Sequence, residues 1–371
     1  MTASERKRIN KREARMSRGE LCFCAFGILT LILCFFFSSV AVESMSRGMR
    51  LCVSVIIPSL FPFMVLSDIL VVSGGAELIS RQLQKPCRFL FGIEGEGVVA
   101  LVLGVLCGFP MGTRSALSLY SSGKLSKRKT EHLLCFCNGP SAAFLINAVG
   151  TTLFLSRRFG YLLYFSSVLA ALCTGLVLRG YFSRGGVDEW AREDEIFEDD
   201  KGGVAQRIVG AITGSAESMI SICAFVLFFS ALTGVLNALL VQIGAGEVAG
   251  ALLLGFFEMT GGVSAASLIP LPYSAVFVAA IVGWSGLSVH FQMIALCKQH
   301  RVSLIPYFAA KLISAALCAG LVALGIVICG GSAELFTPQD QLTIAAPVTQ
   351  PEYLLSVAVI AIGLMKKRAK K

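Results

Sequence analysis

Apolar stretches of eighteen or more residues recur along the whole chain, and each is long enough to cross about 30 Å of hydrocarbon as a helix. Hydrophobic residues make up 55% of the 371 residues and charged residues only 15%, whereas about a quarter of a soluble domain is normally charged. A spanning helix satisfies its own backbone hydrogen bonds within the bilayer. The sequence therefore predicts an all-α polytopic membrane protein and excludes a water-soluble globule.

Two of the candidate membrane segments differ from simple spans. The candidates are 21–42, 51–72, 97–119, 133–155, 160–180, 208–243, 248–270, 273–297, 304–331 and a short 353–365. Gly108–Gly112 interrupts 97–119 and Glu258–Gly262 interrupts 248–270, and both sequences favour a break in the helix. We therefore expect these two segments to turn back as re-entrant hairpins and the other eight to span.

The distribution of Lys and Arg supports the hairpins, because cytoplasmic loops carry an excess of these residues. If both segments turn back, one side holds 26 of the 32 basic residues and the outer loops hold 4; if both cross, the sides hold 19 and 11. The sequence thus predicts a multi-pass protein of the cell (cytoplasmic) membrane with both termini in the cytoplasm. Topology also explains the net charge of +9, so we expect no nucleic-acid partner.

This topology divides the chain into two repeats. The expected parts are a basic cytoplasmic tail (1–20), an uncleaved signal-anchor helix (21–42), a first repeat (51–180), an acidic cytoplasmic linker (181–207), a second repeat (208–331), and an outer loop with a short terminal helix and basic tail (332–371). Each repeat is expected to consist of a span, a hairpin and two further spans. The last spans of the two repeats contain similar segments, at 170–177 and 315–322. Three crossings per repeat place the two repeats in inverted orientation, which is typical of secondary transporters.

Ionisable residues inside membrane segments are costly and usually face a cavity or a partner. They are Arg114, Glu217, Glu258, His290 and Lys311. Arg114 follows the first hairpin break and Glu258 lies at the second, so we expect them to pair or to hold a polar ligand jointly. A structural ion pair that locks the hairpins is the alternative.

Polar residues also mark two further broken segments, at Asn138–Ser141 and at Gly283–His290. Unwound stretches expose backbone groups that bind anions, hydroxyls or cations. Together with the hairpin residues, these segments give the candidate substrate-binding set: Arg114, Asn138, Ser141, Glu258, Thr260, Ser285, Ser288 and His290. For His290, a packing role is the alternative.

Enzyme motifs are poorly represented in the sequence. It contains no Walker loop, no H-E-x-x-H and no G-x-S-x-G. The thirteen cysteines lie mostly in or beside apolar runs without zinc-site spacing, so we interpret them as packing residues. The sequence predicts no catalytic residue, metal or cofactor, and any transport would depend on an ion gradient.

Five motifs in order resemble the YlbJ-type sporulation integral membrane proteins, which belong to the nucleoside-recognition (Gate) domain proteins. The motifs are Ile57–Phe63, Gly108–Gly112, Phe136–Pro140, Phe257–Gly261 and Gly286–Gln292. The resemblance covers about residues 50–330. It implies a role in spore cortex or envelope formation and a more distant similarity to nucleoside transporters, which bind their ligand between two hairpin tips and two unwound helices.

These observations favour a secondary transporter or permease for a small polar solute needed during sporulation. A non-transporting membrane scaffold that recruits or regulates spore-envelope proteins is the alternative, and the handling of lipid or glycan precursors is a third. The expected partners are the lipid bilayer, the solute with its coupling ion, and either a second copy of the chain or other sporulation membrane proteins.

Overall fold

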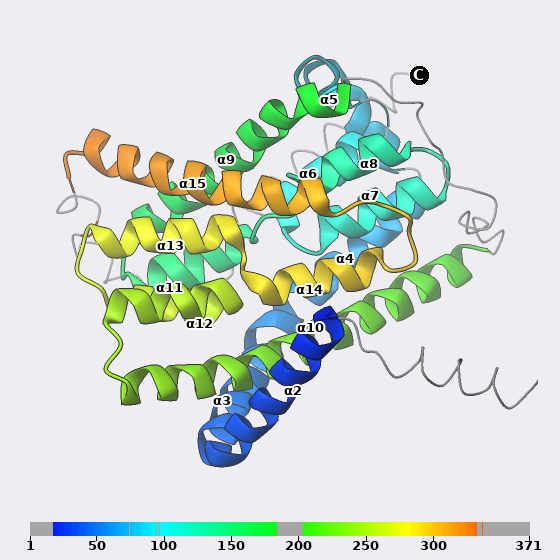
Figure 1. Cartoon of the computed structure of the whole chain (residues 1–371). Coiled ribbons are helices and arrows are strands. Elements are labelled where there is room, and N and C mark those ends of the chain that lie inside the picture. Colours follow the sequence, from blue (N-terminus) through cyan, green and yellow to red (C-terminus); the bar gives the residue numbers. More distant parts are fainter. Residues whose placement is uncertain are drawn as a thin grey trace, which may run out of the picture.

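The computed structural model describes residues 18–73, 75–93, 95, 97–183, 203–331 and 336. Within these residues the chain is helical and contains no strand (Figure 1). The helices are α2 (Arg18–Phe36), α3 (Ser38–Leu51), η1 (Cys52–Ile56), α4 (Ile57–Val72), α5 (Gly75–Phe91), α6 (Gly97–Cys107), α7 (Met111–Ser121), α8 (Lys127–Leu134), η2 (Phe144–Leu153), α9 (Arg157–Ser183), α10 (Val204–Gln242), α11 (Glu247–Phe257), α12 (Met259–Ala266), α13 (Tyr273–Trp284), α14 (Gly286–Cys297) and α15 (Ile305–Ile328). The predicted all-α polytopic class is confirmed.

Among the described residues, five helical segments are long and apolar enough to cross a membrane. They are Gly19–Phe36, Arg157–Ser183, Val204–Gln242, Tyr273–Cys297 and Ile305–Ile328. The predicted spans 51–72 and 133–155 contain only shorter apolar helices, Leu60–Leu70 and Phe144–Leu153. The predicted terminal helix at 353–365 lies outside the described residues.

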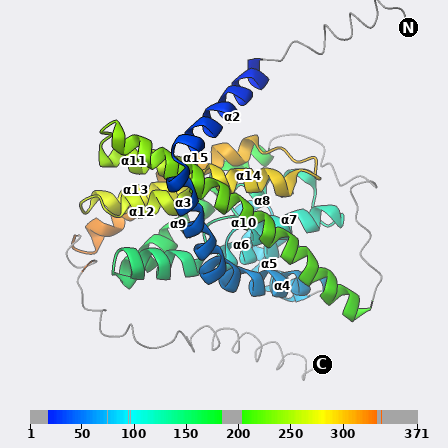
Figure 2. The same ribbon diagram turned by 90° about the horizontal axis from the view of Figure 1, so that it is seen from below.

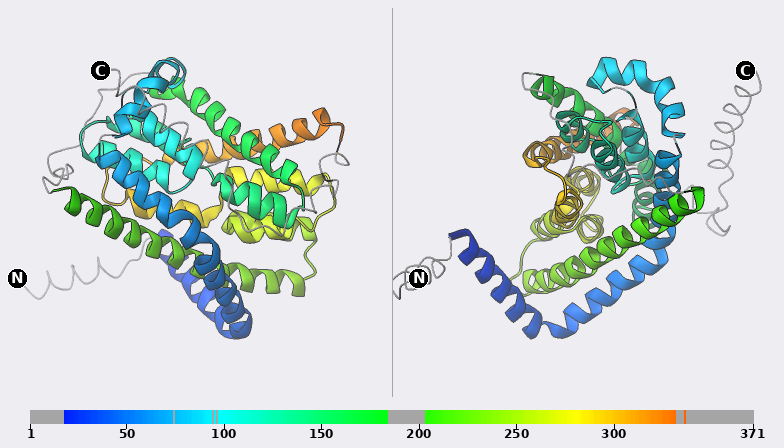
Figure 3. Two further views of the ribbon diagram at one scale, coloured as in Figure 1. Left: turned by 180° about the vertical axis from the view of Figure 1, so that it is seen from behind. Right: turned by 90° about the vertical axis from the view of Figure 1, so that its right-hand side faces the viewer.

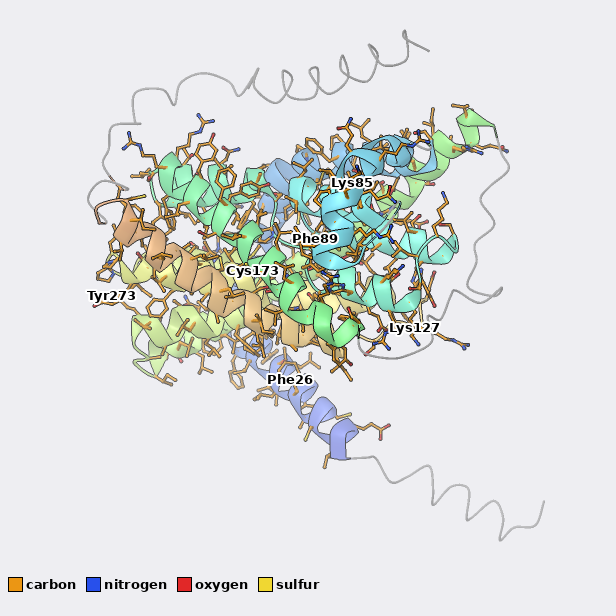
Figure 4. All side chains as sticks on the ribbon, turned by 90° about the horizontal axis from the view of Figure 1, so that it is seen from above. Phe26, Lys85, Phe89, Lys127, Cys173 and Tyr273 are labelled. Atoms are coloured by element: carbon orange, nitrogen blue, oxygen red, sulfur yellow. The ribbon has the colours of Figure 1, made fainter. Side chains whose placement is uncertain are left out.

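The predicted signal-anchor segment does not form one straight helix. It divides at Phe37, where α2 ends and the chain bends into α3, which packs along α10 (Figure 2). Helix α2 extends away from the body of the molecule, with Phe26 on its surface (Figures 3 and 4). Leu31 and Phe35 are 73% and 79% exposed, so the surface of α2 requires hydrocarbon rather than water around it.

The two interrupted segments fold as hairpins of short helices. Helices α6, α7 and α11 have 11 residues each and α12 has 8, so none exceeds about 17 Å at 1.5 Å per residue. A span needs about 30 Å. Helix α6 packs against α7, and α11 packs against α12, as their neighbouring ribbons in Figure 1 also show. Both segments therefore turn back on themselves.

The order of elements repeats along the chain. A helix, a hairpin, a broken helix and a final long helix occur first as α4, α6–α7, α8–η2 and α9, and then as α10, α11–α12, α13–α14 and α15. The two final helices, which carry the similar segments 170–177 and 315–322, pack against each other. The hydroxyls of Thr174 and Ser314 lie 2.9 Å apart at this contact. The inverted orientation of the repeats stays a prediction.

Helix α5 has no counterpart in the second repeat. Residues Gly75–Phe91 are not among the expected membrane segments, and they form an amphipathic helix. Its C-terminal end is tied to α9 by Arg179, whose guanidinium donates to the carbonyls of Phe89 and Leu90. A helix with one apolar and one basic face is suited to the membrane surface, and the alternation of charged and apolar residues in 75–91 was the signal for it.

Several basic loops meet at one end of the molecule. Arg128 donates a 3.3 Å hydrogen bond to the carbonyl of Tyr181, which brings the start of α8 to the end of α9. The hydroxyl of Ser121 lies 2.8 Å from Nε2 of His300, which joins the loop after α7 to the loop after α14. Lys127 and Tyr273 mark opposite ends of the bundle in Figure 4. This grouping supports the cytoplasmic assignment of the basic loops, which stays a prediction.

The first hairpin encloses part of the broken segment that follows it. A Cβ atom on Gly104 would lie 1.9 Å from the carbonyl oxygen of Cys137, and a Cβ on Gly112 would lie 1.8 Å from it. Backbone from the broken segment thus occupies a space that two glycines leave between α6 and α7. A side chain at either position would displace backbone rather than a flexible side chain.

We predict that Gly112→Ala destabilises the fold by about 1–3 kcal/mol through overpacking against the Cys137 carbonyl. The midpoint of thermal unfolding of the purified protein would fall. Gly180→Ala is the matched control, because a Cβ at that position meets nothing within 4 Å. Equal midpoints for the two variants would contradict the close packing of the hairpin.

Candidate solute-binding site

The tip of the first hairpin lies against the unwound stretch of the first broken helix. The amide of Phe109 donates a 2.7 Å hydrogen bond to the carbonyl of Gly139. Gly108 has a φ of +75°, and a Cβ there would lie 2.6 Å from the amide nitrogen of Ser141. Only glycine permits this approach. The tip therefore satisfies one of the carbonyls that unwinding exposes.

The tip of the second hairpin packs against the second break. Ser285 separates α13 from α14, and Ser285 and Gly286, the first residue of α14, have φ values of +74° and +80°. A Cβ on Gly286 would lie 2.8 Å from the amide nitrogen of Met259. The indole of Trp284 donates a 3.0 Å hydrogen bond to the carbonyl of Phe256. Each half of the chain thus brings its hairpin tip to its own broken helix.

Lys311 connects these two breaks. Its side chain projects from α15, is only 5% exposed, and donates from Nζ to the carbonyl of Asn138 at 2.9 Å and to the hydroxyl of Ser285 at 3.1 Å. No carboxylate among the described residues forms an ion pair with it. Lys311 is one of the intramembrane charges expected from the sequence, but it was not among the predicted substrate-binding residues.

Oδ1 of Asn138 and Nε2 of His290 are among the buried polar atoms that lack hydrogen-bond partners within the described residues. Both side chains are 1% exposed. The Nδ2 of Asn138 donates to the carbonyl of Leu134, while Nδ1 of His290 lies 2.8 Å from the hydroxyl of Tyr307, one turn before Lys311. Since buried polar atoms are normally paired, these two are available to a ligand.

Glu258 lies at the second hairpin tip and is 8% exposed. Its carboxylate caps α12 by accepting from the amides of Thr260 at 2.8 Å and Gly261 at 2.6 Å. The positive end of the helix dipole stabilises a carboxylate in this position. Thr260 therefore contributes a backbone amide to the site.

The two remaining serines of the candidate set have local hydrogen bonds. Ser141 accepts from the amide of Phe144 at 3.3 Å, at the start of η2. Ser288 accepts from Gln292 at 3.4 Å, one turn later on α14. Both belong to the broken segments, but neither bonds directly to Lys311.

The predicted direct pairing of Arg114 with Glu258 is wrong. Arg114 forms an ion pair with Asp68, with 2.6 Å between Nη2 and Oδ2. It also donates to the carbonyl of Gly214 at 3.0 Å and to the hydroxyl of Ser218. Arg114 therefore fastens α7 of the first hairpin to α4 and α10, away from the second hairpin tip. Glu258 has its own helix amides as partners.

The groups around Lys311 are the kinds of group that form hydrogen bonds to a ligand. They offer an ammonium, a free amide oxygen and a free imidazole nitrogen, with the aromatic ring of Trp284 4.3 Å from the His290 ring. The described residues contain no group of three His, Cys, Asp or Glu side chains that could hold a metal ion. Such a set can hold a small molecule with both donors and acceptors, against an aromatic wall.

The fold and this buried centre define an all-α polytopic membrane protein whose polar site is built from broken helices. The chain is similar to the sporulation integral membrane protein YlbJ of Bacillus subtilis (strain 168), with 26% identity over 313 residues that cover 76% of each chain. This similarity confirms the predicted relation to the YlbJ-type proteins and indicates an integral membrane protein of sporulation. No protein-family model and no solved structure matches the chain, so its membership of the Gate-domain proteins stays a prediction.

We predict that Arg114 and Asp68 tolerate exchange of their charges but not loss of one partner. Arg114→Asp and Asp68→Arg should each lower the unfolding midpoint, and the double exchange should recover a coupling energy of roughly 0.5–3 kcal/mol. Combining Arg114→Asp with Glu258→Arg is the control and should recover nothing. Recovery only in the control would show that Glu258 is the true partner.

Proposed function

We propose that the protein is a secondary transporter or permease for a small polar solute needed for spore cortex or envelope formation. The observation that carries the proposal is the meeting of two broken helices at one buried lysine, together with two buried polar atoms that have no hydrogen-bond partner in the described part of the chain. The similarity to a sporulation protein is the reason for assigning the proposed transport to sporulation. The solute is proposed to bind in this centre.

The energetics of the bilayer support a ligand there. A charged side chain at the centre of a membrane helix costs about 2.5–3.5 kcal/mol on insertion scales. Lys311 offsets part of this cost through one carbonyl and one hydroxyl, both neutral. An inert core would be more stable with an apolar side chain in its place. Hydrogen bonds from a polar solute to Oδ1 of Asn138 and Nε2 of His290 would explain why costly polar groups are kept in the interior.

The architecture supports transport rather than binding alone. Secondary transporters place their sites at the interface of repeated halves, where discontinuous helices expose backbone groups. Here Asn138 belongs to the first half, while Ser285, His290 and Lys311 belong to the second. Movement of one half against the other would alternately expose such a site. A Gate-domain assignment and a distant similarity to nucleoside transporters are part of this proposal.

The proposal predicts that Asn138→Ala and His290→Ala reduce solute flux while the protein still accumulates in the membrane. Each change removes one hydrogen bond to the solute, so we expect up to about a tenfold loss per substitution. Asn237→Ala is the control, because this asparagine is exposed on α10. The measurement is uptake into proteoliposomes of nucleosides, sugars, amino acids and organic anions, after a thermal-shift screen for binding.

A different outcome would favour the scaffold. If no solute in the panel binds, and if cells carrying Asn138→Ala or His290→Ala form spores like the wild type, the transport proposal fails. Sporulation that instead depends on segment 181–207 or on the terminal tails would identify the protein as a recruiter of envelope proteins.

A further inference from the structure

The ligands of Lys311 resemble those of a bound metal cation more than those of a structural lysine. Structural lysines inside proteins are normally paired with a carboxylate. Lys311 instead donates from Nζ to the backbone carbonyl of Asn138, in an unwound stretch, and to the hydroxyl of Ser285, at a helix break. Carbonyl and hydroxyl oxygens of this kind coordinate coupling cations where transporter helices are discontinuous.

Among the described residues, no carboxylate forms an ion pair with the ammonium of Lys311. The carboxylate of Glu258 accepts from the amides of Thr260 and Gly261, and Asp68 is paired with Arg114. The dipoles of oxygen ligands therefore stabilise the positive charge of Lys311, as they would for a free monovalent cation. The two oxygens come from the two halves of the chain, so any cation held there joins the halves.

We propose that the ammonium of Lys311 is a tethered cation that fills a monovalent-cation site between the two broken helices. The chain then needs no sodium ion at this position, because the positive charge is supplied covalently by α15. The comparison with the coupling-cation sites of transporters rests on the proposed transport function. The occupation of this site by a cation does not depend on that function, and cation binding is measurable without any solute.

The proposal differs from a purely structural bridge in one respect. A bridge is lost when Lys311 is removed, whereas a cation site remains and is open to an ion from solution. Lys311→Gln would add a side-chain oxygen to the oxygens of Asn138 and Ser285, and sodium prefers a set of oxygen ligands. Lys311→Met has similar volume but offers no such oxygen, so it is the matched control.

The test is thermal unfolding of the full-length purified protein in sodium chloride and in choline chloride at equal ionic strength. For the wild type we expect the same midpoint in both salts. For Lys311→Gln we expect a lower midpoint in choline and a rise of several degrees in sodium, because an ion that binds only the folded state stabilises it. Lys311→Met should be destabilised equally in both salts.

Adding Ser285→Ala to Lys311→Gln should weaken the sodium response, since it removes one of the oxygens. If Lys311→Gln does not accumulate, Lys311→Ala is measured with sodium and with ethylammonium, which replaces the missing amine. The proposal is overturned if the wild type is stabilised by sodium, or if no variant responds to a small cation more strongly than Lys311→Met does. Absence of solute flux would reject the transport function and leave this result unaffected.

Discussion

The structure depends on one constraint: a helix that breaks inside a membrane exposes backbone groups that must find partners within the protein. The two broken helices meet this need in parallel ways. Phe109 at the first hairpin tip donates to the carbonyl of Gly139, and the second tip packs closely on Gly286. Lys311 then satisfies the carbonyl of Asn138 and also reaches Ser285. The hairpins and the lysine together make the irregular centre stable.

The same constraint arranges the other charges. Arg114 and Asp68 neutralise each other where α7 meets α4 and α10, and Glu258 is held by the amides at the start of α12. Each of these groups has its partners within the fold, so the remaining polarity is concentrated around Lys311, Asn138 and His290. This concentration makes the centre, rather than the hairpin charges, the best candidate for a ligand.

Local features of the structure could be predicted from the sequence, and long-range contacts could not. The hairpins follow from Gly108–Gly112 and Glu258–Gly262, and the breaks follow from Asn138–Ser141 and Ser285, because glycine, proline and polar residues interrupt helices wherever they occur. The partner of Arg114 lies 46 residues away and the ligand of Lys311 lies 173 residues away. No spacing rule connects such positions, so charge placement alone gave Arg114 the wrong partner and left Lys311 out of the site.

We conclude that one buried lysine bridges the two broken helices and has no carboxylate partner among the described residues. An electron cryo-microscopy structure of the full-length protein in lipid nanodiscs tests it most directly. The account predicts continuous density from Lys311 that places Nζ within hydrogen-bonding distance of the Asn138 carbonyl and the Ser285 hydroxyl. A lysine that points away from the breaks, or that forms an ion pair with Glu258, would contradict it.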